Sequence, residues 1–145
     1  MKKLYLIPFL FIANFCISQT SNKVIGNSKY IEGLEVAEYD FPKVLKWEDA
    51  KIACSRLGVG WRLPTKDELN ILIKYRERIG NFFITEDNVN YNRNLYYSSS
   101  EGGIHHGYIK AWIQDFSNGE QFDGDKLYPY SVRAVRKYKI NINIK

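Results

Sequence analysis

The sequence contains only two cysteines in 145 residues, Cys16 and Cys54. Cys16 lies in an apolar N-terminal segment that we expect to be removed, which would leave Cys54 alone. A lone cysteine cannot form an intramolecular disulfide, even in an oxidising compartment. The fold must therefore be stabilised by packing, and we interpret Cys54 as a small buried apolar side chain on a helix.

A strong excess of either charge is also absent. The chain has 21 Lys and Arg against 16 Asp and Glu, a formal net charge of +5, and loss of Lys2 and Lys3 would lower it to +3. A net positive charge this small would suit a weakly anionic partner, but it is not the strongly basic surface of a nucleic-acid-binding domain. We therefore predict no nucleic-acid partner.

A long apolar run occurs only at the N-terminus, from Leu4 to Ile17. It is shorter than the roughly 20 residues of an ordinary membrane span. Two lysines precede it, and Cys16 and Ser18 place small residues three and one positions before Gln19, as a signal-peptidase site requires. We predict a signal peptide over residues 1–18 and an exported protein, periplasmic, cell-surface or secreted, without a stable membrane span after cleavage.

Two alternatives remain open for this segment. It would be an uncleaved anchor if the signal peptidase did not act on it. It would belong to a lipoprotein if Cys16 were acylated, although Ala13-Asn14-Phe15 lacks the small residues that this processing prefers.

Removal of the signal peptide leaves about 127 residues, a common size for one domain. The composition, 45% hydrophobic and 15% aromatic, is typical of a packed globular chain. We expect a polar lead-in over residues 19–29, one domain over 30–138 and a polar tail over 139–145.

Two amphipathic helices are predicted in the first half, after an early strand over Tyr30–Asp40. The first helix runs from Trp47 to Leu57 and is ended by Gly58. The second begins at Lys66, behind a Thr-x-x-Glu capping box, and extends to about Tyr75 or Ile79 before Gly80.

The second half is predicted to be irregular and rich in strands. Asn81–Tyr97 has no clear period. Strands are expected at Tyr96–Ser100, Tyr108–Phe116 and Ser131–Arg136, with turns at Glu101–Gly103 and at Asn118-Gly119. Helices grouped before strands indicate an α+β fold.

Several blocks of this sequence resemble the DUF1566 family, also called the Lcl C-terminal domain, which is close to the Fibrobacter succinogenes major paralogous domain. The blocks, in chain order, are Trp47-Glu48-Asp49-Ala50, Gly60-Trp61-Arg62-Leu63-Pro64-Thr65, Tyr97-Ser98-Ser99-Ser100, Ala111-Trp112 and Tyr130-Ser131-Val132-Arg133-Ala134-Val135-Arg136. The similarity covers roughly Tyr39 to Lys137.

This resemblance implies a C-type-lectin-like fold, with two N-terminal helices packed on an irregular antiparallel β-rich half. It also implies extracellular binding through the segment between the second helix and the last strand. Some relatives are adhesins for sulfated polysaccharides, and others look like variable receptors with surface aromatic residues in that same half.

The most recognisable residues are interpreted as structural. Trp61 is expected to fill the core, Arg62 and Glu68 to pair across a strand-to-helix turn, and Thr65 to cap the second helix. The full structural set is Trp47, Trp61, Arg62, Pro64, Thr65, Glu68 and Arg133.

The chemistry that related folds carry is not found in the sequence. Formylglycine-generating enzymes use a cysteine pair near the C-terminal end, whereas Cys54 is single. The Glu-Pro-Asn, Gln-Pro-Asp and Trp-Asn-Asp motifs of calcium-dependent lectins do not occur, and Asp115, Asp123 and Asp125 follow no calcium-loop pattern. We predict neither a metal nor a cofactor.

Histidine is also scarce, with only the adjacent pair His105-His106. Neighbouring residues of an extended segment point to opposite faces, which disfavours a shared metal site. A catalytic triad of Ser98–Ser100, His105 and Asp115 lacks a nucleophile-elbow context. We predict a chain that is not an enzyme.

Ligand contact is better assigned to aromatic side chains near the predicted loops, since tyrosine suits recognition surfaces. The candidate residues are Tyr97, His105, His106, Tyr108, Trp112 and Phe122. Arg93, Lys110 and Lys126 could add positive charge for a sulfated or carboxylated glycan.

The leading hypothesis is an exported, non-catalytic module that binds a glycan or a protein at the cell surface. One alternative is a structural component of an envelope assembly, which a large exposed apolar patch would favour. A less favoured alternative is an enzyme with a formylglycine-generating-like fold, which a cleft of titratable groups would favour.

Overall fold

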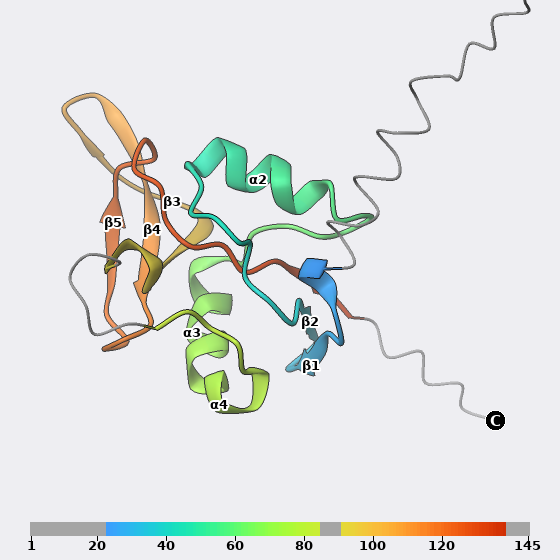
Figure 1. The fold of residues 1–145 in the computed structure, drawn as a ribbon. Helices are drawn as coiled ribbons and strands as arrows, with labels where there is room; N and C mark the ends of the chain where they lie inside the picture. Colours follow the sequence, from blue (N-terminus) through green and yellow to red (C-terminus); the bar gives the residue numbers. More distant parts are fainter. Residues whose placement is uncertain (1–22, 85–90, 139–145) are drawn as a thin grey trace, which may run out of the picture.

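The computed structural model describes residues 23–84 and 91–138 (Figure 1). The predicted signal peptide, residues 1–18, and the tail, residues 139–145, lie outside the described residues, as does part of the irregular segment, residues 85–90. No helix within the described ranges is both long and apolar enough to cross a membrane. The elements are β1 (Lys29–Ile31), β2 (Leu34–Val36), α2 (Trp47–Ser55), α3 (Lys66–Lys74), α4 (Arg76–Ile79), a 3-10 turn (Tyr91–Arg93), β3 (Leu95–His105), β4 (Tyr108–Asp115), β5 (Gln121–Gly124) and β6 (Val135–Lys137).

The strands form two antiparallel sheets, β1-β2-β6 and β3-β4-β5. The C-terminal segment joins them, because Ser131 bridges to Tyr96 of β3 before the chain enters β6. Figure 1 shows this segment passing between α2 and α3, which lie on opposite sides of it. The arrangement is α+β, as the order of the predicted elements indicated.

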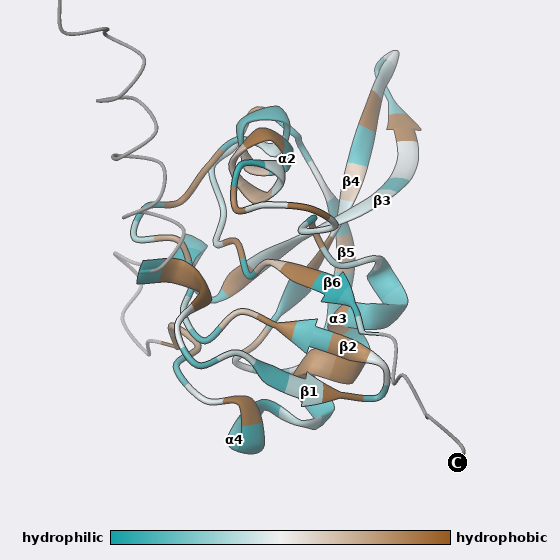
Figure 2. Ribbon diagram, turned by 90° about the vertical axis from the view of Figure 1, so that its right-hand side faces the viewer, coloured by the Kyte–Doolittle hydropathy of each residue, from teal (hydrophilic) through white to brown (hydrophobic). Residues whose placement is uncertain are grey.

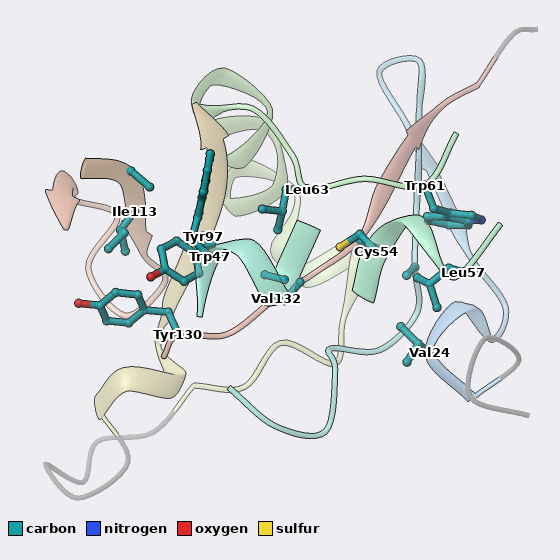
Figure 3. Packing of buried hydrophobic residues seen from close by; sticks show 14 of the residues in the cluster. Val24, Trp47, Cys54, Leu57, Trp61, Leu63, Tyr97, Ile113, Tyr130 and Val132 are labelled. Carbon is teal, nitrogen blue, oxygen red and sulfur yellow. The ribbon is translucent and has the colours of Figure 1, made fainter. Parts of the chain in front are cut away.

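Two hydrophobic clusters fill the interior, and β3 contributes to both. Leu95 and Tyr97 pack into the cluster beneath α2, whereas Tyr96 packs into the cluster beneath α3. Side chains alternate between the two faces of a strand, so consecutive residues reach different cores. Figure 3 shows the α2 cluster extending from Ile113 to Trp61.

The second helix has its predicted N-terminal cap, whereas the first, α2, ends at Ser55 and not at the predicted Leu57. The Thr65 side chain accepts a hydrogen bond from the Glu68 N–H, and the Glu68 side chain accepts one from the Thr65 N–H, which confirms the capping box. Tyr75 leaves helical geometry, with φ −106° and ψ 17°, and separates α3 from the single turn α4. Gly80 follows α4 with φ +74°.

The single early strand predicted over Tyr30–Asp40 is wrong. Two short strands, β1 and β2, form a hairpin there instead. The chain reverses at Glu32 and Gly33, whose φ angles are +46° and +81°. Positive φ at both central residues is the geometry of a tight hairpin turn, and Glu-Gly is a weaker sequence indication of it than Asn-Gly.

The turn predicted at Glu101–Gly103 is also wrong, since these residues continue β3. The chain reverses farther on, at His106 and Gly107, with φ angles of +49° and +81°. The pairing of β3 with β4 shifts register on both sides of Glu101. The glycines there accommodate a close approach of Asp123, whose Cβ lies 2.7 Å from the position of a Cβ built on Gly102.

Other segment boundaries also differ from expectation. The final strand spans Val135–Lys137 rather than Ser131–Arg136, because the preceding residues cross between the sheets. The polar lead-in contributes Val24 to the core, where it is 2% exposed. The packed part of the described chain therefore begins before Tyr30.

Candidate binding site

The Arg62–Glu68 pair has the structural role predicted for it. Nη1 and Nη2 of Arg62 donate to the two oxygens of Glu68 at 2.7 and 2.8 Å. Burial alone would raise the pKa of Glu68, but the hydrogen bonds from Arg62 and from the Thr65 N–H outweigh it and lower that pKa. The carboxylate is therefore held charged as part of a helix cap.

Arg133 is fully buried and acts as a hub, that is, one side chain bonded to several separate segments of the chain. Its Nε pairs with Asp40 at 2.5 Å. Its Nη atoms donate to the carbonyl oxygens of Ala37, Glu38, Gly80 and Asn81. The guanidinium ties the segment after β2 to the segment after α4, which is a scaffold role.

The two tryptophans of the predicted structural set, Trp47 and Trp61, are also core residues. Trp61 is 4% exposed and Trp47 is 5% exposed. Trp47 Nε1 donates to the Ser98 carbonyl at 2.8 Å, and the ammonium groups of Lys51 and Lys126 lie 3.8 and 3.9 Å from the centre of its ring. Trp47 therefore joins α2 to β3 and to the segment after β5.

Tyr97 does not lie on the surface, so its prediction as a ligand contact is wrong. It is 0% exposed, and burial raises the pKa of its phenol. Its hydroxyl donates to the carbonyl oxygens of Asp125 and Tyr128, at 3.1 and 2.6 Å. The sequence does not distinguish a tyrosine on a recognition surface from a core tyrosine whose hydroxyl bonds to buried groups.

The far end of the β3–β4 hairpin, residues 102–109, is the most exposed apolar feature near the predicted site. Ile104 is 73% exposed, Tyr108 is 74% exposed and Ile109 is 45% exposed. Figures 1 and 2 both show this hairpin end projecting beyond the rest of the described chain. His105 and His106 are exposed within it.

The two histidines are closer than an extended segment would place them. Their ring centroids are 4.2 Å apart with an interplanar angle of 75°. His106 occupies the turn with positive φ, so the expectation of opposite faces is wrong at this position. Three of the six predicted contacts, His105, His106 and Tyr108, thus gather at the hairpin end.

Trp112 and Phe122 lie lower on the sheet, away from the turn. Trp112 is half-buried opposite Asp123 in the strand ladder, and the Lys66 ammonium lies 3.1 Å from its ring centroid. Phe122 is 36% exposed and lies opposite Ile113. These two side chains are therefore on opposite faces of the β4–β5 pair, because adjacent strand residues alternate.

Besides Ile104 and Ile109 of the hairpin end, the sequence reasoning missed two exposed apolar residues of the following loop. Leu127 is 68% exposed and Tyr128 is 59% exposed, and both lie in the loop of residues 125–128. Lys126 of this loop forms an ion pair with Glu101, next to the hairpin end. The sequence offered one indication of this exposed site, namely the apolar residues between Lys126 and Pro129 in an otherwise polar segment.

The described residues do not assemble the catalytic or metal sites that were considered. No group of three or more His, Cys, Asp and Glu side chains in them could hold a metal ion. Asp115 pairs with Leu95 at one end of the β3–β4 ladder and His105 pairs with Tyr108 at the other, so the Ser-His-Asp arrangement is not formed. Burial raises the pKa of the Cys54 thiol to about 12.

The family comparison identifies the domain. The Lcl C-terminal domain family matches residues 19–136, so this chain belongs to that family. No curated protein sequence matched the chain.

Solved structures place the fold. The chain is similar to botrocetin, a protein of C-type-lectin-like fold, with 12% identity, a TM-score of 0.53, and coverage of 77% of this chain and 97% of that one. It is also similar to a chain in the complex of botrocetin with a mutant von Willebrand factor A1 domain, with 10% identity, a TM-score of 0.51 and the same coverage. At these identities the likeness concerns the fold alone.

Proposed function

We propose that this protein is an exported, non-catalytic binding module with a C-type-lectin-like fold, which meets a glycan or protein at the cell surface through the end of the β3–β4 hairpin. The observation that carries the proposal is the concentration of exposed apolar and aromatic residues at a projecting end of a well-packed domain. Membership of the Lcl C-terminal domain family supports it, and so does the fold shared with a protein solved in complex with a partner domain.

The structural roles of the potentially reactive side chains support a non-catalytic function. The thiol of Cys54 is buried, and the Ser98 hydroxyl donates to the Trp112 carbonyl at 2.8 Å. The buried pair of Arg133 and Asp40 bridges segments of the scaffold. Buried ion pairs of this kind are found in the scaffold of a fold as well as in active sites.

Immobilised protein lacking residues 1–18 would be screened against a glycan array and against purified proteins of the same cell envelope. We expect saturable binding that falls at least tenfold when Ile104 and Tyr108 are both changed to Ser. The matched control is Val59→Ser, since Val59 is 93% exposed on the Gly58–Gly60 turn. Equal binding by all three proteins would contradict the placement of the site.

A further inference from the structure

The loop of residues 125–128 is held more firmly than its exposed position would suggest. The Tyr97 hydroxyl donates to the Asp125 and Tyr128 carbonyls, and the Trp47 N–H donates to the Lys126 carbonyl at 3.2 Å. The Tyr97 side chain is buried, and the Trp47 N–H is a backbone group at the start of α2. The loop is thus held by the side chain of one core aromatic residue, Tyr97, and by the backbone of another, Trp47.

The loop is also closed on itself. The Leu127 N–H donates to the Asp125 carboxylate at 2.8 Å, and the Tyr128 N–H donates to the Asp125 carbonyl at 3.2 Å. The Leu127 and Tyr128 side chains nevertheless remain 68% and 59% exposed. A fixed backbone that presents exposed apolar side chains is preorganised for binding, because little loop entropy remains to be lost.

Most charged side chains around this end are engaged with other groups of the domain, but Lys110, directly after the hairpin end, has no partner among the described residues. Lys126 pairs with Glu101 and lies over the Trp47 ring. The Asp123 carboxylate accepts from the Gly103 N–H at 3.2 Å. Arg93, another of the cations considered for a sulfated glycan, lies before the other end of β3, where it donates to the Pro42 carbonyl at 3.1 Å and stacks on Phe83.

The hairpin end has no Lys, Arg, Asp or Glu, since residues 102–109 read Gly-Gly-Ile-His-His-Gly-Tyr-Ile. The exposed Ile104, Ile109 and Leu127 are aliphatic, so they offer a sugar neither a flat ring to stack on nor a hydrogen bond. An uncharged apolar depression on a protein surface accepts such side chains, and projecting aromatic and aliphatic anchors are the side chains that fill such depressions.

We infer that the partner of this module is a protein with an uncharged apolar surface, and that Leu127 and Tyr128 of the preorganised loop are its central anchors, with Ile104 and Tyr108 of the hairpin end as adjacent contacts. This inference rests on the proposed function and narrows it to one class of partner.

The probes are a random-peptide library displayed on phage and an array of neutral and sulfated glycans, both applied to protein lacking residues 1–18. We expect peptides rich in apolar and aromatic residues to be selected. Their affinity should fall about tenfold or more in the Leu127→Ser/Tyr128→Ser double variant and stay within about twofold in Val59→Ser. It should change little between about 0.05 and 0.5 M salt, because charge attraction is not used.

A second variant tests preorganisation separately. Tyr97→Phe removes the hydroxyl that anchors the loop but keeps Leu127 and Tyr128, so we expect faster dissociation of the same peptides. Lys126→Gln should change their affinity by no more than about twofold if the lysine acts only within the domain.

The two proposals fail in different ways. Binding to a sulfated glycan that weakens steeply with salt and is unchanged in the double variant would overturn the inference and leave the proposed function intact. Dimerisation that the double variant abolishes would replace the foreign partner with a second copy and also overturn it. A folded protein that binds no peptide, glycan or envelope protein would overturn both.

Discussion

The two ends of the β3–β4 ribbon belong to one continuous ladder but have opposite surroundings. Residues 95–98 of β3 are buried between the two hydrophobic clusters, whereas His105 and Tyr108 at the other end are exposed. The base therefore contributes to folding free energy through burial. The projecting end contributes little, so its residues are available for recognition.

The largest effect is expected at the base. Arg133→Ala would leave Asp40 Oδ1 and several carbonyl groups without their guanidinium donor, which costs about 3–5 kcal/mol of the free energy of unfolding for a buried pair. Urea denaturation would measure it. Arg78→Ala, in the exposed part of α4, is the control and should cost less than about 0.5 kcal/mol.

Arg133→Lys makes this prediction testable if the alanine variant does not accumulate. Lysine keeps the charge but cannot reach the same set of acceptors, because it lacks the planar guanidinium fork. A lysine variant as stable as the wild type would contradict the hub role of Arg133.

A smaller effect is expected from removing one buried hydroxyl. Tyr97→Phe keeps the ring but removes the hydroxyl that donates to the Tyr128 carbonyl, whereas the Asp125 carbonyl keeps the Tyr128 N–H, and the loss should cost about 1–3 kcal/mol. Tyr108→Phe makes the same chemical change at the exposed end and should have almost no effect. Equal midpoints of thermal unfolding for the two variants would contradict the difference between the buried base and the exposed end of the ribbon.

The ion pair at the start of α3 should make stability depend on pH. The pKa of Glu68 is lowered below the ordinary value of 4.5 in the folded protein. The unfolded chain therefore binds a proton more readily, so the stabilisation is complete above about pH 4.5 and is lost as the pH falls through the folded pKa.

Glu68→Gln keeps an amide that can still cap the helix but removes the charge. It should cost about 1 kcal/mol near neutral pH and flatten the dependence of unfolding free energy on pH below about 5. Chemical denaturation at a series of pH values would measure both. Glu77→Gln, whose side chain is 94% exposed, should leave the wild-type profile unchanged.

The smallest stability change is expected at the projecting end. Ile104→Ser alters a side chain that is 73% exposed and should shift the free energy of unfolding by less than about 0.5 kcal/mol. Ile113→Ser, in the same pair of strands but 0% exposed, is the contrasting variant. Similar losses in both would show that the hairpin end is packed in solution.

Local sequence patterns predicted the features that depend on neighbours in the chain. The Thr65–Glu68 capping box, the apolar face of α2 and the turn at Asn118-Gly119 all require residues within a few positions of one another. The order of elements, the α+β class and the family were predictable for the same reason, since the order and spacing of short blocks are properties of the sequence alone.

Tertiary packing decided what local patterns could not. The sequence Gly102-Gly103 predicts a turn, but in the folded chain Asp123 of β5 lies against these glycines and they continue β3. Tyr97 and Tyr108 have the same side chain, but one is fully buried beneath a loop and the other is 74% exposed. The free energy of a tyrosine depends on which distant groups surround it, and only the folded chain brings those groups together.

The sequence by itself thus determined the scaffold, because caps, periodicity and turn residues act over short separations. Which exposed side chains are available for a partner was decided by the tertiary structure, since exposure is what remains after distant segments have packed. Leu127 and Tyr128 became candidate contacts only when the buried Trp47 and Tyr97 were seen to fix the loop that presents them.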